Sequence, residues 1–237
     1  MTITDHKKSA ADLVSEGKTD FLVTGFFTPD YFPLALALSQ NLKEFGISHH
    51  LYKREKSVGA WGHQTLQKPS VLKTARKDYP DASLIMMDVD CRVRGDISAI
   101  TQCVGDLALP FGRKPMKNGT ALKPGTRVML VRPTKAADIA LDLWEEKCRL
   151  DIQPVENDEI RLQMAIEEGA GRFSISTLPR IFQGYEIRKA QPDDLIIHDS
   201  ARDEARILGG LRKDLKFWFR NARNAVSQAL TGKDYHR

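Results

Sequence analysis

A short apolar run that ends in two aspartates constrains this chain more than any other feature of its sequence. Residues 83–87 read Ser-Leu-Ile-Met-Met, and Asp88 and Asp90 follow at once. Consecutive apolar residues are typical of a strand buried on both faces of a parallel sheet. Because alternate side chains of a strand point to the same side, the two acids can emerge together at its tip. Paired carboxylates suit Mg²⁺ or Mn²⁺, which would in turn hold a diphosphate.

The rest of the chain alternates between strand and helix patterns. This order predicts an α/β protein whose mostly parallel sheet has helices on both faces and ligands at the carboxyl ends of its strands. We predict residues 53–68 as a loop, 107–126 as a loop facing the active site, and a helix capped by Asp96 that runs to Val104. The other predicted strands are 21–27, 47–52, 128–131, 173–175 and 195–197, and the other predicted helices are 31–45, 69–79, 136–150 and 160–169.

Composition and cysteine content narrow the class of protein. A chain of 237 residues, 41% of them hydrophobic, can bury one large α/β core or at most two small ones. Its three cysteines have no metal-ligand spacing, which favours reduced thiols in a cytoplasmic protein. The first 18 residues are polar and lack a signal-peptide core, and no apolar run is long enough to cross a bilayer.

The positive charge is concentrated at the C-terminal end. Residues 206–237 hold eight Lys/Arg against two acids, so the other 205 residues of this +5 chain sum to −1. The body of the protein is therefore electrically ordinary, unlike a globally basic protein that binds nucleic acid. We predict an amphipathic helix in this tail, with an apolar face and an adjoining basic face. The apolar face consists of Leu211, Leu215, Trp218, Phe219, Ala222 and Val226, and the basic face of Arg212, Lys213, Lys216, Arg220 and Arg223. The helix either lies peripherally on the inner face of an anionic membrane or packs on the body of the protein.

Several short motifs carry a resemblance to a known family. In order they are Thr24-Gly25, Trp61…Thr65…Lys68-Pro69…Leu72, Met87-Asp88-Val89-Asp90…Gly95-Asp96-Ile97, Asn157-Asp158-Glu159, Leu178-Pro179 and Ile196-Ile197-His198. Over residues 20–200 the chain resembles GT-A-type glycosyltransferases, most of all the nucleotide-diphospho-sugar transferases. It is more distantly similar to glycogenin-like and lipopolysaccharide galactosyltransferase-like retaining enzymes. The resemblance implies a GT-A (Rossmann-like) catalytic domain, which we expect over 19–200, between a polar segment 1–18 and the tail 201–237.

The resemblance implies a metal site made of Asp88, Asp90 and His198. A neutral imidazole is also, by its own chemistry, a good Mn²⁺ ligand beside two carboxylates. The competing interpretation of His198 is a surface histidine at the end of a strand. We expect Mn²⁺ or Mg²⁺ as the cofactor.

The resemblance also implies a donor site near the first predicted strand. Thr24 and Tyr31 lie where such enzymes hold the base and ribose, and the ring of Tyr31 offers a stacking face. Lys68 could place its ammonium against the diphosphate or the donor sugar, with Asp88 beside it. Tyr31 could instead be a core residue, and Lys68 a surface residue.

The acids Asp158 and Glu159 are the candidate catalytic residues. Asp158 matches a family acid near the donor sugar or acceptor, but Glu159 stands where the family often has an amide. Either carboxylate could be a general base in an inverting reaction or stabilise a cationic centre in a retaining one. Both could equally be helix N-terminal acids.

The leading prediction is a metal-dependent, retaining glycosyltransferase that uses a UDP- or GDP-sugar and a glycan or lipid-linked acceptor. A haloacid-dehalogenase type of phosphohydrolase also places Asp-x-Asp at a strand tip, but there the first acid sits on the opening strand. A third alternative is a non-catalytic, basic-tailed adaptor on a transferase scaffold.

Overall fold

The computed structural model describes residues 12–56, 61–116, 119–150 and 157–198. All of them belong to the unit Met1–His198. The predicted tail 201–237 and its amphipathic helix lie outside the described residues. None of the described helices is long and apolar enough to cross a membrane.

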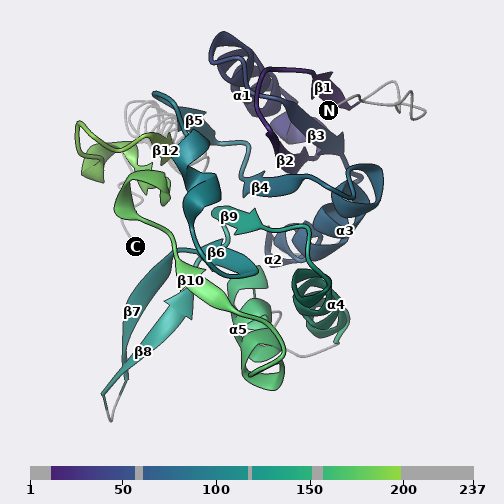
Figure 1. The fold of residues 1–237 in the computed structure, drawn as a ribbon, viewed down its shortest axis with the longest axis vertical. Coiled ribbons are helices and arrows are strands. Elements are labelled where there is room, and N and C mark those ends of the chain that lie inside the picture. The colour runs from purple at the N-terminus through teal and green to yellow at the C-terminus, as the bar shows by residue number, and fades with distance from the viewer. Residues whose placement is uncertain (1–11, 57–60, 117–118, 151–156, 199–237) are drawn as a thin grey trace, which may run out of the picture. The chain divides into compact units, whose positions relative to one another are not determined.

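The seven-stranded main sheet has the order β1-β3-β2-β4-β9-β6-β10 (Figure 1). Its centre is three parallel strands, β2 (Phe21–Phe27), β3 (His49–Lys53) and β4 (Ser83–Met87). Each is rich in apolar residues, and together they confirm the predicted parallel α/β core.

Two strands of this sheet run against the others. β9 (Val128–Val131) is antiparallel to both β4 and β6 (Leu107–Leu109), while β10 (Ile175–Thr177) is parallel to β6. The edge strand β1 (Leu13–Ser15) is antiparallel to β3. β1 lies inside the predicted polar segment 1–18, where three residues offer too short a pattern to show a strand.

Alternate residues of β4 face two different helical layers, which explains why its run is apolar throughout. Ile85 and Met87 share a core with α1 (Phe32–Glu44). Leu84 and Met86 share the other core with α3 (Lys68–Asp78), α4 (Lys135–Arg149) and α5 (Asp158–Glu168). Helices therefore cover both faces of the sheet, as expected from the sequence.

Three predictions about loops and short helices were wrong. The predicted loop 107–126 contains β6 and an antiparallel hairpin of β7 (Phe111–Met116) and β8 (Gly119–Pro124). The Pro, Gly and Lys residues of this segment are typical of loops, so its composition did not indicate the hairpin. The predicted helix from Asp96 to Val104 is only a 3₁₀ turn at Ser98–Gln102, although the Asp96 carboxylate does accept from the Ser98 amide. The predicted loop 53–68 contains the short helix α2 (Trp61–Thr65).

A second sheet closes over the end of β4. It has the order β11-β12-β5, made of Tyr185–Glu186, Ile196–His198 and Cys91–Val93. The remaining 3₁₀ turns are Pro29–Tyr31, Arg180–Phe182 and Ile187–Lys189.

Candidate active site

The ammonium group of Lys68 joins two acids that are far apart in the sequence. Its Nζ lies 2.8 Å from Oδ1 of Asp88, at the end of β4, and 3.1 Å from Oδ2 of Asp158, at the start of α5. It also donates to the hydroxyl and carbonyl oxygens of Thr126, at 3.1 and 3.2 Å. Lys68 is 4% exposed, so it is a buried residue and not the surface lysine of the alternative interpretation. This arrangement places a cation between two acids at the carboxyl edge of the sheet.

Asp158 is held on every side. Its carboxylate accepts from the Thr126 hydroxyl at 2.5 Å, its carbonyl accepts from the Trp144 indole at 3.1 Å, and its amide donates to the Thr65 hydroxyl at 3.4 Å. The preceding residue, Asn157, caps α5 by accepting from the Ile160 amide. A carboxylate that is 2% exposed and fixed in this way has one orientation, which points toward Lys68.

The charges in this cluster shift one another's pKa values. Burial raises the pKa of Asp88 to about 6, helped by the charge of Asp90 and opposed by Lys68. Burial acts in the same direction on Asp158, but Lys68 and Thr126 outweigh it and hold the pKa of Asp158 below its ordinary value. For Lys68, burial lowers the pKa, and the two acids more than compensate, so its pKa lies above the ordinary value. Asp158 and Lys68 are therefore both charged near neutral pH.

Asp88 and Asp90 lie in a turn at the tip of β4. The Asp88 amide donates to the Arg127 carbonyl, and the Asp88 carbonyl accepts from the Cys91 amide, which closes the turn. Strand alternation therefore does not place the two acids, because β4 ends at Met87. The second sheet brings in His198, which pairs with Cys91 in the antiparallel β12–β5 ladder. The backbone of His198 therefore lies opposite the residue that follows Asp90. His198 is buried, with only 3% of its surface exposed.

Glu159 lies next to Asp158 in sequence but has different partners. It forms an ion pair with Lys123 of β8 and accepts from the Asn157 amide group at 3.3 Å. Successive residues at a helix N-terminus point in different directions, so only Asp158 reaches Lys68. The predicted helix-terminal interpretation holds for both acids, since α5 begins at Asp158.

The two residues predicted to hold the nucleotide differ in accessibility. Thr24 is completely buried in β2, and its hydroxyl donates to the His50 carbonyl at 3.2 Å. Tyr31 follows the carboxyl end of β2 and is partly buried against the core that contains α1. Tyr31 therefore keeps some exposed surface, whereas Thr24 has none.

Thr126, Trp144 and Arg127 also contact the acid cluster, and no sequence pattern predicts them there. Thr126 lay in the predicted loop and Trp144 on a predicted helix face. Nothing in the local pattern of either residue indicates a polar contact with Asp158. For Arg127, whose carbonyl accepts from Asp88, the side chain carries no signal at all because the contact is made by backbone.

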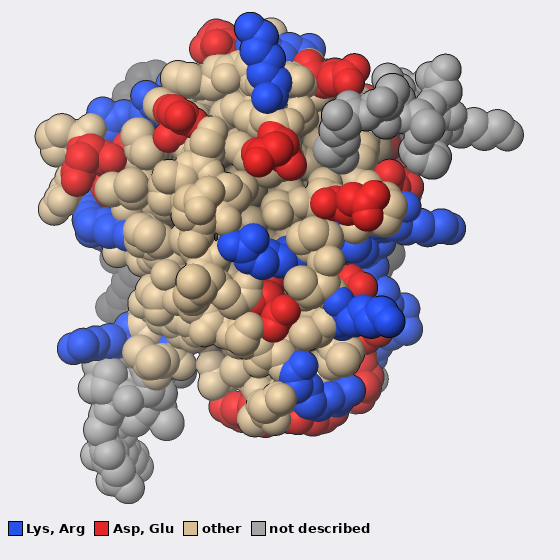
Figure 2. Space-filling view, in the orientation of Figure 1, with Lys and Arg blue, Asp and Glu red and all other residues tan. Residues whose placement is uncertain are grey.

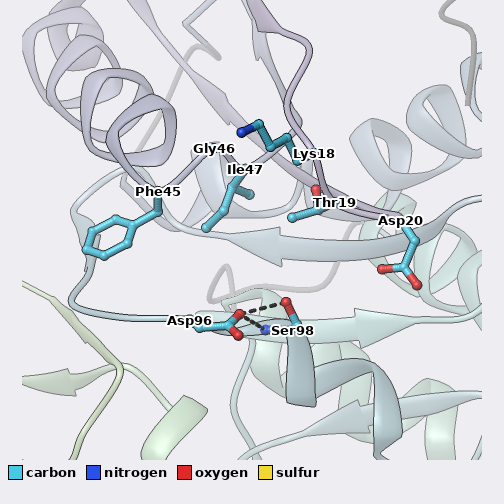
Figure 3. Close-up of a pocket in the computed structure, with 8 residues that line it drawn as sticks. All are labelled: Lys18, Thr19, Asp20, Phe45, Gly46, Ile47, Asp96 and Ser98. Carbon is cyan, nitrogen blue, oxygen red and sulfur yellow. Dashed lines mark hydrogen bonds between the residues drawn. The ribbon is translucent and has the colours of Figure 1, made fainter.

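A pocket of about 360 Å³ lies at the opposite edge of the sheet (Figure 3). Its walls come from the segments that precede β2 and β3 and from the turn after β5, namely Lys18, Thr19, Asp20, Phe45, Gly46, Ile47, Asp96 and Ser98. Because β2, β3 and β4 are parallel, this pocket is at their amino ends and Asp88 is at their carboxyl ends. The pocket is therefore separate from the acid cluster.

The charged side chains on the face shown in Figure 2 are mixed in sign. Lys/Arg and Asp/Glu are interspersed there without a continuous basic area. This fits the sequence expectation that the body of the protein is electrically ordinary.

Comparisons with solved structures match this architecture to one fold. A glycosyltransferase involved in glycosylation of the major capsid of PBCV-1 aligns with a TM-score of 0.52 at 13% identity, over 78% of this chain and 96% of that one. The glycosyltransferase GlyE of Streptococcus pneumoniae TIGR4 aligns with a TM-score of 0.51 at 15% identity, over 78% of this chain and 56% of GlyE.

The galactosyltransferase LgtC, solved with donor and acceptor sugar analogues, aligns with a TM-score of 0.50 at 10% identity, over 76% of this chain and 87% of LgtC. The chain has the GT-A glycosyltransferase fold. No protein-family profile and no curated protein sequence matches it.

In this chain the acid turn follows β4, and His198 belongs to the second sheet. The phosphohydrolase alternative required the first acid on the opening strand, whereas Asp88 follows the third parallel strand of the sheet.

Proposed function

We propose that this protein is a metal-dependent glycosyltransferase that moves a sugar from a nucleoside-diphosphate donor to an acceptor. The observation that carries the proposal is the Lys68 bridge between Asp88 and Asp158 at the carboxyl edge of a GT-A fold. Ligands of such sheets bind at this edge. The catalytic domain would be residues 19–200.

The donor set at the β4 tip fits a divalent cation. Asp88 and Asp90 would supply hard oxygen atoms and His198 a nitrogen atom, and the β12–β5 pairing supports this because His198 lies opposite Cys91, the residue after Asp90. No group of three such side chains is already arranged as a metal site within the described ranges. Asp88, Asp90 and His198 would hold Mn²⁺ or Mg²⁺, which would neutralise charge on the leaving diphosphate.

Lys68 is proposed to act next to the donor site through its two ion pairs. Its charge is already balanced by Asp88 and Asp158, so its main work is to hold both carboxylates in place and to limit their repulsion of the diphosphate. Tyr31 would stack on the base of a UDP- or GDP-sugar. Thr24, whose hydroxyl is engaged with β3, would shape the floor beneath the base.

Asp158 is the proposed catalytic carboxylate. Glu159, which is paired with Lys123, is the second candidate. Asp158 is ionised and rigid, so its carboxylate can stabilise positive charge that develops at the anomeric carbon. We propose retention of configuration, which proton NMR of the first product anomer would test. The acceptor would be a glycan or a lipid-linked sugar, reached in the cytoplasm or at the inner face of a membrane.

A thermal-shift screen tests the proposal. The melting temperature is measured with UDP- and GDP-sugars, each in Mn²⁺ and in EDTA. A donor that binds only the folded protein raises the melting temperature by mass action. We expect a rise in Mn²⁺ alone, lost in Asp90→Ala and kept in the matched control Asp96→Ala, an exposed acid that caps the Ser98 turn.

The non-catalytic adaptor makes a different prediction in the same screen. It would bind no donor, so the Mn²⁺-dependent rise would be absent in the wild type. Donor binding that persists unchanged in Asp90→Ala would contradict the metal site.

A further inference from the structure

The strand that carries His198 is held from both sides. This strand, β12, lies between β5 and β11 in the second sheet, and Figure 1 shows it beside β5. On one side His198 pairs with Cys91, the residue that follows Asp90. On the other side His198 pairs with Glu186 of β11. The position of His198 relative to the acid turn therefore depends on where both neighbouring strands are anchored.

Arg127 anchors the β11 side of the sheet. It is the residue just before β9, and its backbone carbonyl accepts from the Asp88 amide at 2.9 Å. Its guanidinium Nη1 donates to the Gly184 carbonyl at 2.9 Å, and Gly184 directly precedes β11. One residue therefore joins the acid turn through its backbone and the outer strand of the second sheet through its side chain.

The contact between Arg127 and Gly184 is close as well as hydrogen-bonded. A Cβ added at Gly184 would lie 3.2 Å from Cδ of Arg127 and 3.1 Å from Cγ2 of Val128. Gly184 also has a φ of 64°, in the left-handed region that favours glycine. The chain is thus turned at Gly184 against the side chain of Arg127, and it enters β11 from there.

We propose that Arg127 is a positioning residue of the metal site, which sets the place of His198 relative to the two acids of the β4 turn. The inference rests on the proposed function, because it concerns the ion that Asp88, Asp90 and His198 would hold. A guanidinium is always charged and has no acceptor, so Arg127 is not itself a ligand. It acts by holding β11, and the β11–β12 pairing passes this restraint to His198.

Binding of Mn²⁺ to the full chain, without donor, tests the inference. The dissociation constant is measured from the electron paramagnetic resonance signal of free Mn²⁺. The test variant is Arg127→Met, which keeps an unbranched side chain against Gly184 but cannot donate to its carbonyl. The matched control is Arg132→Met, at the other end of β9. Arg132 also donates to loop carbonyls, those of Gly105 and Thr101, so the control removes an arginine with similar contacts.

We expect the dissociation constant of Mn²⁺ to rise about tenfold in Arg127→Met, as is usual when a group that orients a metal ligand is lost. It should stay unchanged in Arg132→Met. Arg127→Lys, which keeps a donor on a long side chain, should recover part of the loss. Electron spin-echo modulation detects a nitrogen atom bound to Mn²⁺, and this signal should weaken only in Arg127→Met. Equal affinity and an equal nitrogen signal in wild type and Arg127→Met would overturn the inference.

Amide hydrogen exchange in EDTA measures the same restraint without the metal. The amides of β11 and β12 should exchange faster in Arg127→Met than in wild type, whereas those of β2 and β4 should not. Unchanged exchange in the second sheet would also contradict the inference. A wild-type protein that binds no Mn²⁺ would contradict the proposed function, whereas a wild type that binds Mn²⁺ no more tightly than Arg127→Met would overturn only the inference.

Discussion

Lys68 and Asp158 lie 3.1 Å apart and tie the first residue of α3 to the first residue of α5 across the edge of the sheet. Both side chains are almost completely buried, so neither charge can be satisfied by solvent. The pair therefore links the stability of the fold to the geometry of the candidate site.

Removing the ammonium should be costly for the fold. Lys68→Met leaves Asp158 buried without its cation, which typically lowers the free energy of unfolding by about 3–5 kcal/mol. Lys73, on the same helix, pairs with Asp142 and Glu145 but is 39% exposed, so Lys73→Met should cost less than about 1 kcal/mol. Urea unfolding of both variants measures the difference, and similar losses would show that the Lys68 bridge contributes no more than a surface pair.

The two neighbouring acids should differ in catalysis. Asp158→Asn should lower kcat for donor hydrolysis or transfer by about 100-fold or more, because it removes the charge that faces the site. Glu159→Gln should change kcat by only about threefold, since its carboxylate is engaged with Lys123. Melting temperatures of both variants control for folding. The reverse order of effects would assign the catalytic role to Glu159.

Gly25 should tolerate no side chain. A Cβ at this position in β2 would lie 2.4 Å from the carbonyl oxygen of Met87, and Met87 is the residue just before Asp88. Gly25→Ala should therefore separate β2 from β4 and destabilise the protein by about 1–3 kcal/mol. In Gly112→Ala the nearest atom would be 3.9 Å away, so this control should be neutral. Thermal unfolding compares the two, and equal melting temperatures would contradict the close approach.

Stability should fall in mild acid because of His49. This side chain is fully buried, with Nε2 2.8 Å from the Ser39 hydroxyl, and burial lowers its pKa. The unfolded chain therefore binds the proton first, and the free energy of unfolding decreases as pH drops below about 6.5, by at most about 1.4 kcal/mol per pH unit.

Urea unfolding at pH 7.5 and 5.5 measures this dependence. Asp88, with a pKa of about 6, titrates in the same range and opposes the effect of His49, because its raised pKa adds stability as pH falls. The comparison of wild type with a His49 variant therefore isolates the histidine. His49→Gln retains a polar group beside Ser39 but does not titrate, so it should show a flatter pH dependence. An unchanged slope in that variant would assign the effect to other groups.

The basic tail should bind anionic vesicles if it is a membrane contact. Co-sedimentation of the full chain should weaken as salt rises, because surface attraction is screened over about 8–10 Å. Lys213→Glu/Lys216→Glu/Arg220→Glu should abolish binding and leave donor hydrolysis intact. Truncation at Arg206 that lowers stability, without any salt-sensitive vesicle binding by the full chain, would favour packing on the body instead.

Local patterns in the sequence determined the elements of the core. The apolar run 84–87, the helical spacing of Leu38 and Leu42, and the acids at the start of α5 each depend on residues within a few positions of one another. Such patterns reflect backbone periodicity and burial, which neighbouring residues report directly. The parallel centre of the sheet and the acids at the tip of β4 followed from them.

The tertiary structure alone decided how distant segments meet. The reversed direction of β9, the pairing of His198 with Cys91, the hairpin within 107–126 and the contact of Thr126 with Asp158 all join residues without a shared local pattern. The sequence left open whether Lys68 faces the donor or is a surface residue, and the residue is buried because two acids, 20 and 90 positions later, offset the cost of its desolvation. The choice between Asp158 and Glu159 has the same origin, since the direction of α5 against the sheet decides which carboxylate meets that cation.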